Sequence, residues 1–248
     1  MSGTEKSASR TRVLLTIGML LVVVVAPIVS VAIVLVSSSR RAEQERCAST
    51  SLKTISSAEA DFRSNDRDWN HVNDFWTGDV KGLYTMTSAA VRGAVAGNPR
   101  DPSIQLIDFS VAAGDADGTF IPAGGENLPL NAFGPPAVKS GYWYAALLLD
   151  LTLSGTREAT YRLDTEGTPA MGPCHNTSKF GFVAFPDSSV AGKYVFRMNE
   201  NNTIFREELI GKPREGSKTP PGLDAIPKAL LEWPDDGNLK RNWSEQLQ

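Results

Sequence analysis

The sequence contains few of the residues that most often carry out catalysis or bind transition metals. Two cysteines and two histidines occur among its 248 residues. The patterns G-x-S-x-G, H-E-x-x-H and Cys-x-x-Cys, which mark common hydrolase, metalloprotease and redox sites, are missing. No block of basic residues is present and the formal net charge is -3, so we expect no nucleic-acid partner. These absences predict a protein that is not an enzyme and that has no cofactor, with calcium as the one alternative considered below.

Charge is also missing from a long apolar run near the N-terminus. The segment Val13–Val36 contains no charged residue. As an α-helix its 24 residues extend roughly 36 Å, enough to cross a bilayer core of about 30 Å. The apolar region of a cleaved signal peptide is shorter, about 7–15 residues. We therefore predict one transmembrane helix at 13–36 in a lipid bilayer, preceded by a short cytoplasmic tail at 1–12.

The orientation of this anchor does not follow from its flanking charges. Three basic residues lie shortly before the anchor and three lie shortly after it, so the positive-inside rule does not decide. The short N-terminal tail resembles the cytoplasmic end of a signal-anchor. We therefore predict that the C-terminal domain is extracytoplasmic.

The segment after the anchor is predicted to continue as a helix. Arg40–Asn65 contains neither proline nor glycine, and Leu52, Ile55, Glu59 and Phe62 recur at steps of three and four residues. One long helix therefore has its first half in lipid and its second half against the soluble domain. Leu52, Ile55 and Phe62 are the residues expected to pack on that domain.

The later sequence predicts an antiparallel sheet, and the fold class is α+β. Short connections between consecutive strands favour antiparallel neighbours. One face of such a sheet is expected to be solvated, and the polar half of the long helix is the available cover for the other. The predicted strands are Tyr142–Leu149, Phe180–Phe185, Lys193–Met198 and Thr203–Glu207, with a further short candidate at 104–109. The domain is predicted to span 37–210, and 211–248 to form a polar C-terminal extension with a short helix near 224–233.

Six segments carry a resemblance to a known family. They are Ser51–Phe62, Asn65–Trp76, Gly82–Tyr84, Gly141–Tyr144, Phe180–Pro186 and Phe196–Phe205. Taken in order, they resemble segments of bacterial pilin-like proteins, the type IV pilins and the pseudopilins of type II secretion. The resemblance implies a pilin-like fold at the bacterial inner (cytoplasmic) membrane, with a structural or assembly role. It also implies other pilin-like subunits or secretion components as partners.

One feature of prepilins is missing. Gly18 and Met19 would begin the mature helix, and its fifth position would then be Val23 in place of the glutamate that pilins carry there. No Asp or Glu occurs in the anchor. We therefore predict a pilin-like domain on a permanent anchor. A membrane-tethered binding module and an anchored enzyme are the alternative functions, and the latter lacks a supporting motif.

A calcium loop is the candidate metal site. Oxygen ligands at positions one, three, five and nine, with a backbone carbonyl at position seven, suit Ca²⁺. The matching residues are Asp66, Asp68, Asn70, Val72 and Asp74. His71 stands where the turn prefers glycine, and Thr77 stands where a bidentate glutamate is usual. These two departures favour the alternative, an Asx-rich turn before the next element.

Three smaller features have open or ordinary interpretations. Cys47 and Cys174 are candidates for a disulfide in an oxidising compartment, or are two unrelated small residues. The acidic turn Asp115–Gly118 is predicted to be an ordinary loop. Aromatic residues such as Tyr142, Trp143 and Tyr144 form a carbohydrate-binding face or part of the core, and strand alternation places Trp143 opposite the two tyrosines.

Overall fold

The chain divides into two compact units, Met1–Ala42 and Glu43–Gln248. This computed structural model describes residues 3–67, 72–85, 105–116, 136–147, 149–150, 159–160, 175–209, 220–222, 226 and 244–245. The segment 86–104 lies outside these residues, and so does the helix predicted near 224–233 apart from Ile226.

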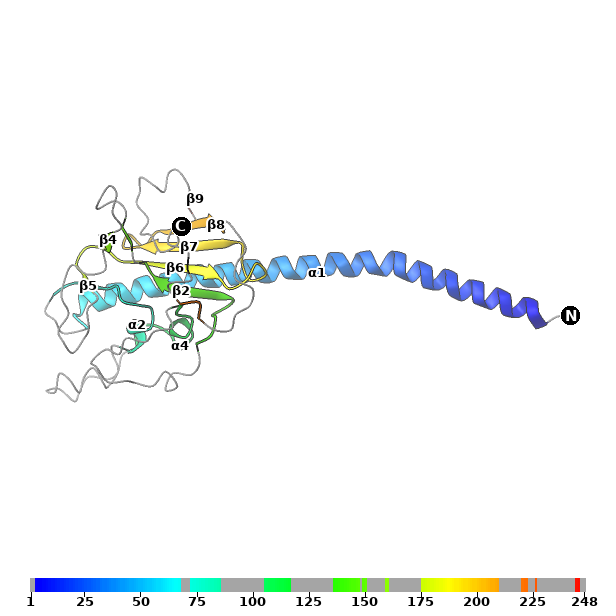
Figure 1. Cartoon of the computed structure of the whole chain (residues 1–248), viewed down its shortest axis with the longest axis horizontal. Coiled ribbons are helices and arrows are strands. Elements are labelled where there is room, and N and C mark those ends of the chain that lie inside the picture. Colours follow the sequence, from blue (N-terminus) through cyan, green and yellow to red (C-terminus); the bar gives the residue numbers. More distant parts are fainter. Residues whose placement is uncertain are drawn as a thin grey trace. The chain divides into compact units, whose positions relative to one another are not determined.

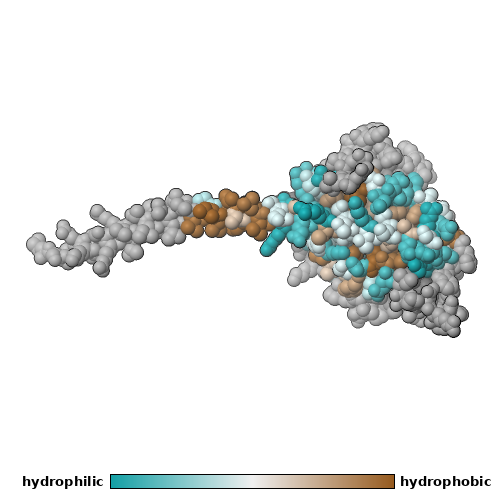
Figure 2. Space-filling view, turned by 180° about the vertical axis from the view of Figure 1, so that it is seen from behind, coloured by the Kyte–Doolittle hydropathy of each residue, from teal (hydrophilic) through white to brown (hydrophobic). Residues whose placement is uncertain are grey.

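A single helix, α1 (Gly3–Ser64), forms the described part of the first unit and continues into the second. Its large apolar side chains from Val25 to Val36 are exposed, and Figure 2 shows this stretch as a band of hydrophobic surface. By length and composition, α1 contains one segment able to cross a membrane. The prediction of a long apolar N-terminal helix is therefore confirmed, and such a helix is compatible with a membrane anchor or a signal sequence.

The second unit is built around an antiparallel sheet with the strand order β2-β6-β7-β8-β9. Strands β2, β6, β7 and β8 lie side by side in Figure 1. Their bounds are β2 Tyr142–Ala146, β6 Gly181–Pro186, β7 Tyr194–Asn199, β8 Ile204–Glu208 and β9 Ser244–Glu245. The predicted α+β class and antiparallel sheet are therefore confirmed, with strand ends that differ from the prediction by at most three residues.

Four shorter strands form two small ladders. Strand β1 (Phe75–Trp76) pairs antiparallel with β5 (His175–Asn176), and β3 (Leu149–Asp150) pairs antiparallel with β4 (Ala159–Thr160). The run predicted as one strand to Leu149 thus ends as β2 at Ala146, and Leu149 begins a separate strand.

Two short helices, α2 (Gly82–Thr85) and α4 (Phe109–Ala112), complete the described elements. The strand predicted over 104–109 is wrong in its described part, because no strand is found there and Phe109 begins α4. The backbone N–H groups of Val111 and Ala112 both donate to the carbonyl of Asp108. These bonds close a helical turn, and the apolar residue Ile107 still reaches the core, with an exposed fraction of 4%.

Both faces of the sheet are buried, so the prediction of one solvated face is wrong. Successive side chains of a strand point to opposite faces. Tyr142 and Tyr144 of β2 belong to the cluster that also contains the apolar face of α1. Trp143 belongs to a second cluster with Val183 and Val195, on the other face of the sheet. The strands are therefore nearly continuous apolar runs, because a separate hydrophobic cluster buries each face of the sheet.

Residues far apart in the sequence cover the face of the sheet that carries Trp143. Ala116 and Ile226 are buried in the cluster around Trp143, and Val138 and Leu209 pack at its border. Strand β9 adds a short pairing to β8. The polar segment predicted as a C-terminal extension thus contributes both an apolar side chain and a strand to the domain.

Candidate functional site

The apolar face of α1 and the sheet meet in a surface that we call the helix–sheet seam, defined by Leu52, Ile55 and Phe62. All three side chains have an exposed fraction of 0%. They share one hydrophobic cluster with residues of β2, β6 and β7. The ring of Phe62 lies 6.4 Å from that of Trp76, centroid to centroid. Steps of three and four residues place these side chains on one side of the helix, which is the side that the sheet covers.

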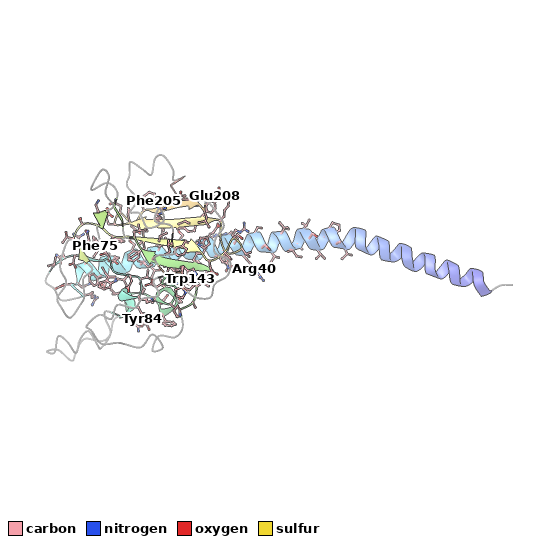
Figure 3. The ribbon with its side chains drawn as sticks, viewed as in Figure 1. Arg40, Phe75, Tyr84, Trp143, Phe205 and Glu208 are labelled. Atoms are coloured by element: carbon pink, nitrogen blue, oxygen red, sulfur yellow. The ribbon has the colours of Figure 1, made fainter. Side chains whose placement is uncertain are left out.

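The domain also contacts α1 near Gln44 and Glu45, at the end of the buried segment opposite Phe62. The backbone N–H of Lys193 donates to Oε1 of Glu45 at 2.9 Å. Gly141 has a φ of +75°, and a side chain there would press on Ala191 and Gln44. Figure 3 shows Phe75 and Glu208 at opposite ends of the domain. The domain therefore contacts α1 along its length from residue 45 to Phe62.

Glu59 interrupts the apolar seam with a fully buried carboxyl group. Its Oε2 accepts a hydrogen bond of 2.9 Å from the backbone N–H of Trp76, which ties β1 to α1. Burial raises the pKa of Glu59 well above its usual value, the hydrogen bond from Trp76 lowers it, and the charge of Asp74 raises it further. Oε1 of Glu59 accepts no hydrogen bond from any residue that the structure describes. The seam therefore contains a polar group that costs stability unless another species satisfies it.

The segment from Asp74 to Leu83 is buried at every residue, although more than half of it is polar or glycine. Asp79 organises its turn, since its carboxylate accepts from the backbone N–H of Gly82 and from the indole N–H of Trp76. The same indole N–H also donates to the carbonyl of Asp79 at 2.9 Å. A Cβ on Gly82 would overlap the indole ring, so glycine is required at this position.

Asp115 also holds the segment from Asp74 to Leu83, through hydrogen bonds to its backbone. Its exposed fraction is 0%, and its Oδ2 accepts two hydrogen bonds of 2.9 Å from the backbone N–H groups of Val80 and Lys81. Its neighbours bind the edge of the sheet, because Tyr144 N–H donates to the carbonyl of Gly114. Asp115 therefore lies outside the named helices and strands, as a loop residue should, but it is buried and holds the segment from Asp74 to Leu83 in place.

The residues predicted as a calcium loop are described only in part. Asp66 and Val72 are half-buried, and Asp74 has an exposed fraction of 1%. Asp68 and Asn70 lie outside the described residues. Within the described part of the chain, no group of three or more His, Cys, Asp or Glu side chains is placed to hold a metal ion. The complete loop therefore stays a prediction.

The two candidate disulfide cysteines cannot be compared directly. Cys47 is a half-buried free cysteine on α1, and Cys174 lies outside the described residues. Cys47 lies near the hydroxyl of Tyr144, whose pKa burial raises to about 12. The pairing stays a prediction.

The aromatic residues of β2 do not form an exposed binding face. Tyr142, Trp143 and Tyr144 have exposed fractions of 0–2%. The indole N–H of Trp143 donates to Asp187, and the hydroxyl of Tyr142 donates to the carbonyl of Tyr194. These aromatics are core residues, and the hydroxyl of Tyr144 is buried without a hydrogen-bond partner among the residues that the structure describes.

No family model, curated protein or solved structure matches the chain. The fold places the chain in the α+β class. Its long N-terminal helix begins with an exposed apolar segment and ends in the core, packed against an antiparallel sheet.

The buried acids are the residues whose role the sequence alone did not reveal. Glu59 recurs with the apolar residues of the helix face, and this periodicity was the one signal that it is buried. Asp115 offered no comparable signal, because an acid between alanines and glycines is typical of a surface turn.

Proposed function

We propose that this chain is a membrane-anchored structural protein of pilin-like architecture, with its folded domain outside the cytoplasm. The observation that carries the proposal is the division of α1 into an exposed apolar segment and a segment buried beneath the sheet. An exposed run of valine, isoleucine and leucine costs free energy in water and is stabilised in lipid. A helix that is both lipid anchor and domain core attaches the domain to the membrane.

The role proposed here is non-catalytic, and it depends on packing. In a pilin-like protein, apolar helices pack against other helices in the bilayer, so other copies of the chain or secretion components are the proposed partners. The anchor has no acidic residue, so pairing with a neighbour's amino terminus is not part of the proposal. A membrane-tethered binding module is the second candidate, and the buried carboxyl groups near β1 favour it.

The topology is testable with reporter fusions. Alkaline phosphatase fused after Gln248 is active only outside the cytoplasm, so we expect activity from this fusion and none from a fluorescent cytoplasmic reporter at the same position. The intact mass of the membrane-extracted protein should retain the anchor. An inactive phosphatase with a bright cytoplasmic reporter would reverse the orientation. A mature chain that begins at Met19 would contradict the permanent anchor and favour a processed pseudopilin.

A further inference from the structure

One strongly exposed apolar side chain lies in the turn between β6 and β7, residues 187–193. Val190 has an exposed fraction of 71%, which is higher than that of any large apolar side chain from Val25 to Val36. The tip of the turn, residues 188–192, contains no charged residue. The tip can therefore leave water without the cost of removing a charge from it.

Backbone hydrogen bonds fix the shape of this turn. The N–H of Ala191 donates to the carbonyl of Ser188 at 3.1 Å, which closes the tip. The N–H of Asp187 donates to the carbonyl of Gly141 at 2.9 Å, which ties the start of the turn to the residue before β2. The turn therefore keeps Val190 exposed in the folded domain.

The turn lies at the end of the second unit where α1 enters it. The chain enters this unit at Glu43, and the N–H of Lys193, at the end of the turn, donates to the carboxylate of Glu45. The other end of β6 lies at the far end of the unit. There the ring of Phe180 lies 4.8 Å from that of Phe75, centroid to centroid, beside the last turn of α1. The β6–β7 turn is therefore next to the residues that connect the domain to the apolar segment.

The chain between the apolar segment and this turn is short. Glu45 follows Val36 by nine residues, which as a helix measure roughly 14 Å. The headgroup layer of a bilayer extends roughly 5–8 Å beyond the hydrocarbon core on each side. With Val36 at the edge of that core, the turn has to bridge roughly 6–9 Å from Glu45 to the headgroups, which is within the length of three residues.

We propose that the β6–β7 turn contacts the lipid surface and that Val190 inserts at the boundary between headgroups and acyl chains. This inference rests on the membrane anchor proposed above. One apolar side chain is far too small for a stable contact with another protein, which buries about 1,200–2,000 Å². A contact with lipid needs much less area here, because the anchor makes it intramolecular and gives it a high effective concentration. The occupant of this surface is therefore the bilayer that the anchor crosses.

Quenching of a fluorescent label by spin-labelled lipid tests this contact. The full-length chain, with its two native cysteines replaced by alanine, is placed in lipid nanodiscs at one copy per disc. A nitrobenzoxadiazole label is attached through Ser189→Cys, which leaves Val190 in place, or through one of two controls. Ile33→Cys reports on the anchor, and Asn201→Cys lies in the exposed turn at the other end of β7. We expect lipid with a doxyl group high on its acyl chain to quench the labels at Ile33 and Ser189 and to quench the label at Asn201 about threefold less or weaker still, because an inserted apolar residue lies about 5–10 Å into the interface.

Substitutions of Val190 then assign the contact to its side chain. We expect Val190→Asp to lower the quenching at Ser189 to the level at Asn201, and Val190→Ile to preserve it. Both should fold, since exposed substitutions usually change stability little. Unchanged quenching in Val190→Asp would overturn the role of Val190.

The controls separate this inference from the proposed function. Strong quenching at Ile33, with quenching at Ser189 as weak as at Asn201, would overturn the lipid contact and leave the anchor intact. An unquenched label at Ile33 would overturn the anchor and the contact together. A label at Ser189 that is shielded only in discs with two copies of the chain would overturn the lipid contact and identify a second copy as the occupant.

Discussion

Phe62→Ala is expected to destabilise the domain by about 3–5 kcal/mol. The side chain is fully buried in the helix–sheet seam and lies against Trp76. Truncation leaves a cavity between α1 and β1, because the surrounding structure relaxes only in part to fill it. A domain of this size has a total stability of about 5–15 kcal/mol. Thermal unfolding of the full-length protein in detergent should show a melting temperature lower by roughly 6–20 °C.

The matched control for this substitution is Lys53→Ala, on the exposed face of the same helix. It should leave the melting temperature within a degree or two of the wild type, since exposed substitutions usually change stability by less than about 0.5 kcal/mol. Arg63 is a poorer control, because its guanidinium lies 4.6 Å from the centre of the Phe75 ring. Equal melting temperatures for Phe62→Ala and Lys53→Ala would show that α1 does not pack on the domain through this face.

Asp115→Ala is expected to have an effect of similar size through a different cause. It removes the acceptor of two buried backbone N–H groups, those of Val80 and Lys81. Each buried donor left without an acceptor costs about 1–3 kcal/mol, so the total is roughly 2–6 kcal/mol. Chemical denaturation followed by tryptophan fluorescence should report the loss, because Trp76 lies in the segment that these bonds hold.

Two further variants separate the hydrogen bonds from other effects at Asp115. Asp115→Asn keeps a side-chain oxygen at the same place, and it should lose less stability than Asp115→Ala. Asp108→Ala removes an exposed carboxylate from the same segment, one that makes no side-chain capping bond to α4, and it should change little. If Asp115→Ala and Asp108→Ala unfold at the same denaturant concentration, the two hydrogen bonds do not hold the buried segment.

The periodic features of the chain could be predicted from the sequence. The absence of proline and glycine after Arg40 and the steps of three and four from Leu52 to Phe62 predicted a helix with one apolar face. Aromatic and branched residues separated by short turns predicted the strands β6, β7 and β8. Both patterns reflect local geometry, so they can be read without knowledge of the rest of the chain.

Features that depend on distant contacts could not be predicted in this way. The second face of the sheet is covered by Ala116, Val138 and Ile226, and none of these residues lies in a segment with a periodic pattern. Asp115 is buried because it accepts hydrogen bonds from residues 34 and 35 positions earlier in the chain. Glu59 lies on a face that was predicted correctly, but its partner Trp76 comes from a strand of two residues, too short for alternation to reveal.

The central claim is that one helix passes from lipid into the core of a folded domain, and cysteine reactivity in lipid nanodiscs tests it most directly. Single cysteines at Ile33, Ile55 and Ser57, with Cys47 and Cys174 replaced by alanine, sample the exposed apolar segment, the seam and the exposed face of α1. With a water-soluble maleimide, the account predicts rapid labelling at Ser57 and slow labelling at Ile33 and Ile55. A denaturant concentration that unfolds the domain but leaves the bilayer intact should release the cysteine at Ile55 while the one at Ile33 stays protected. Labelling at Ile33 as fast as at Ser57 in the intact nanodisc would contradict the anchor, and equally fast labelling at Ile55 and Ser57 would contradict the seam.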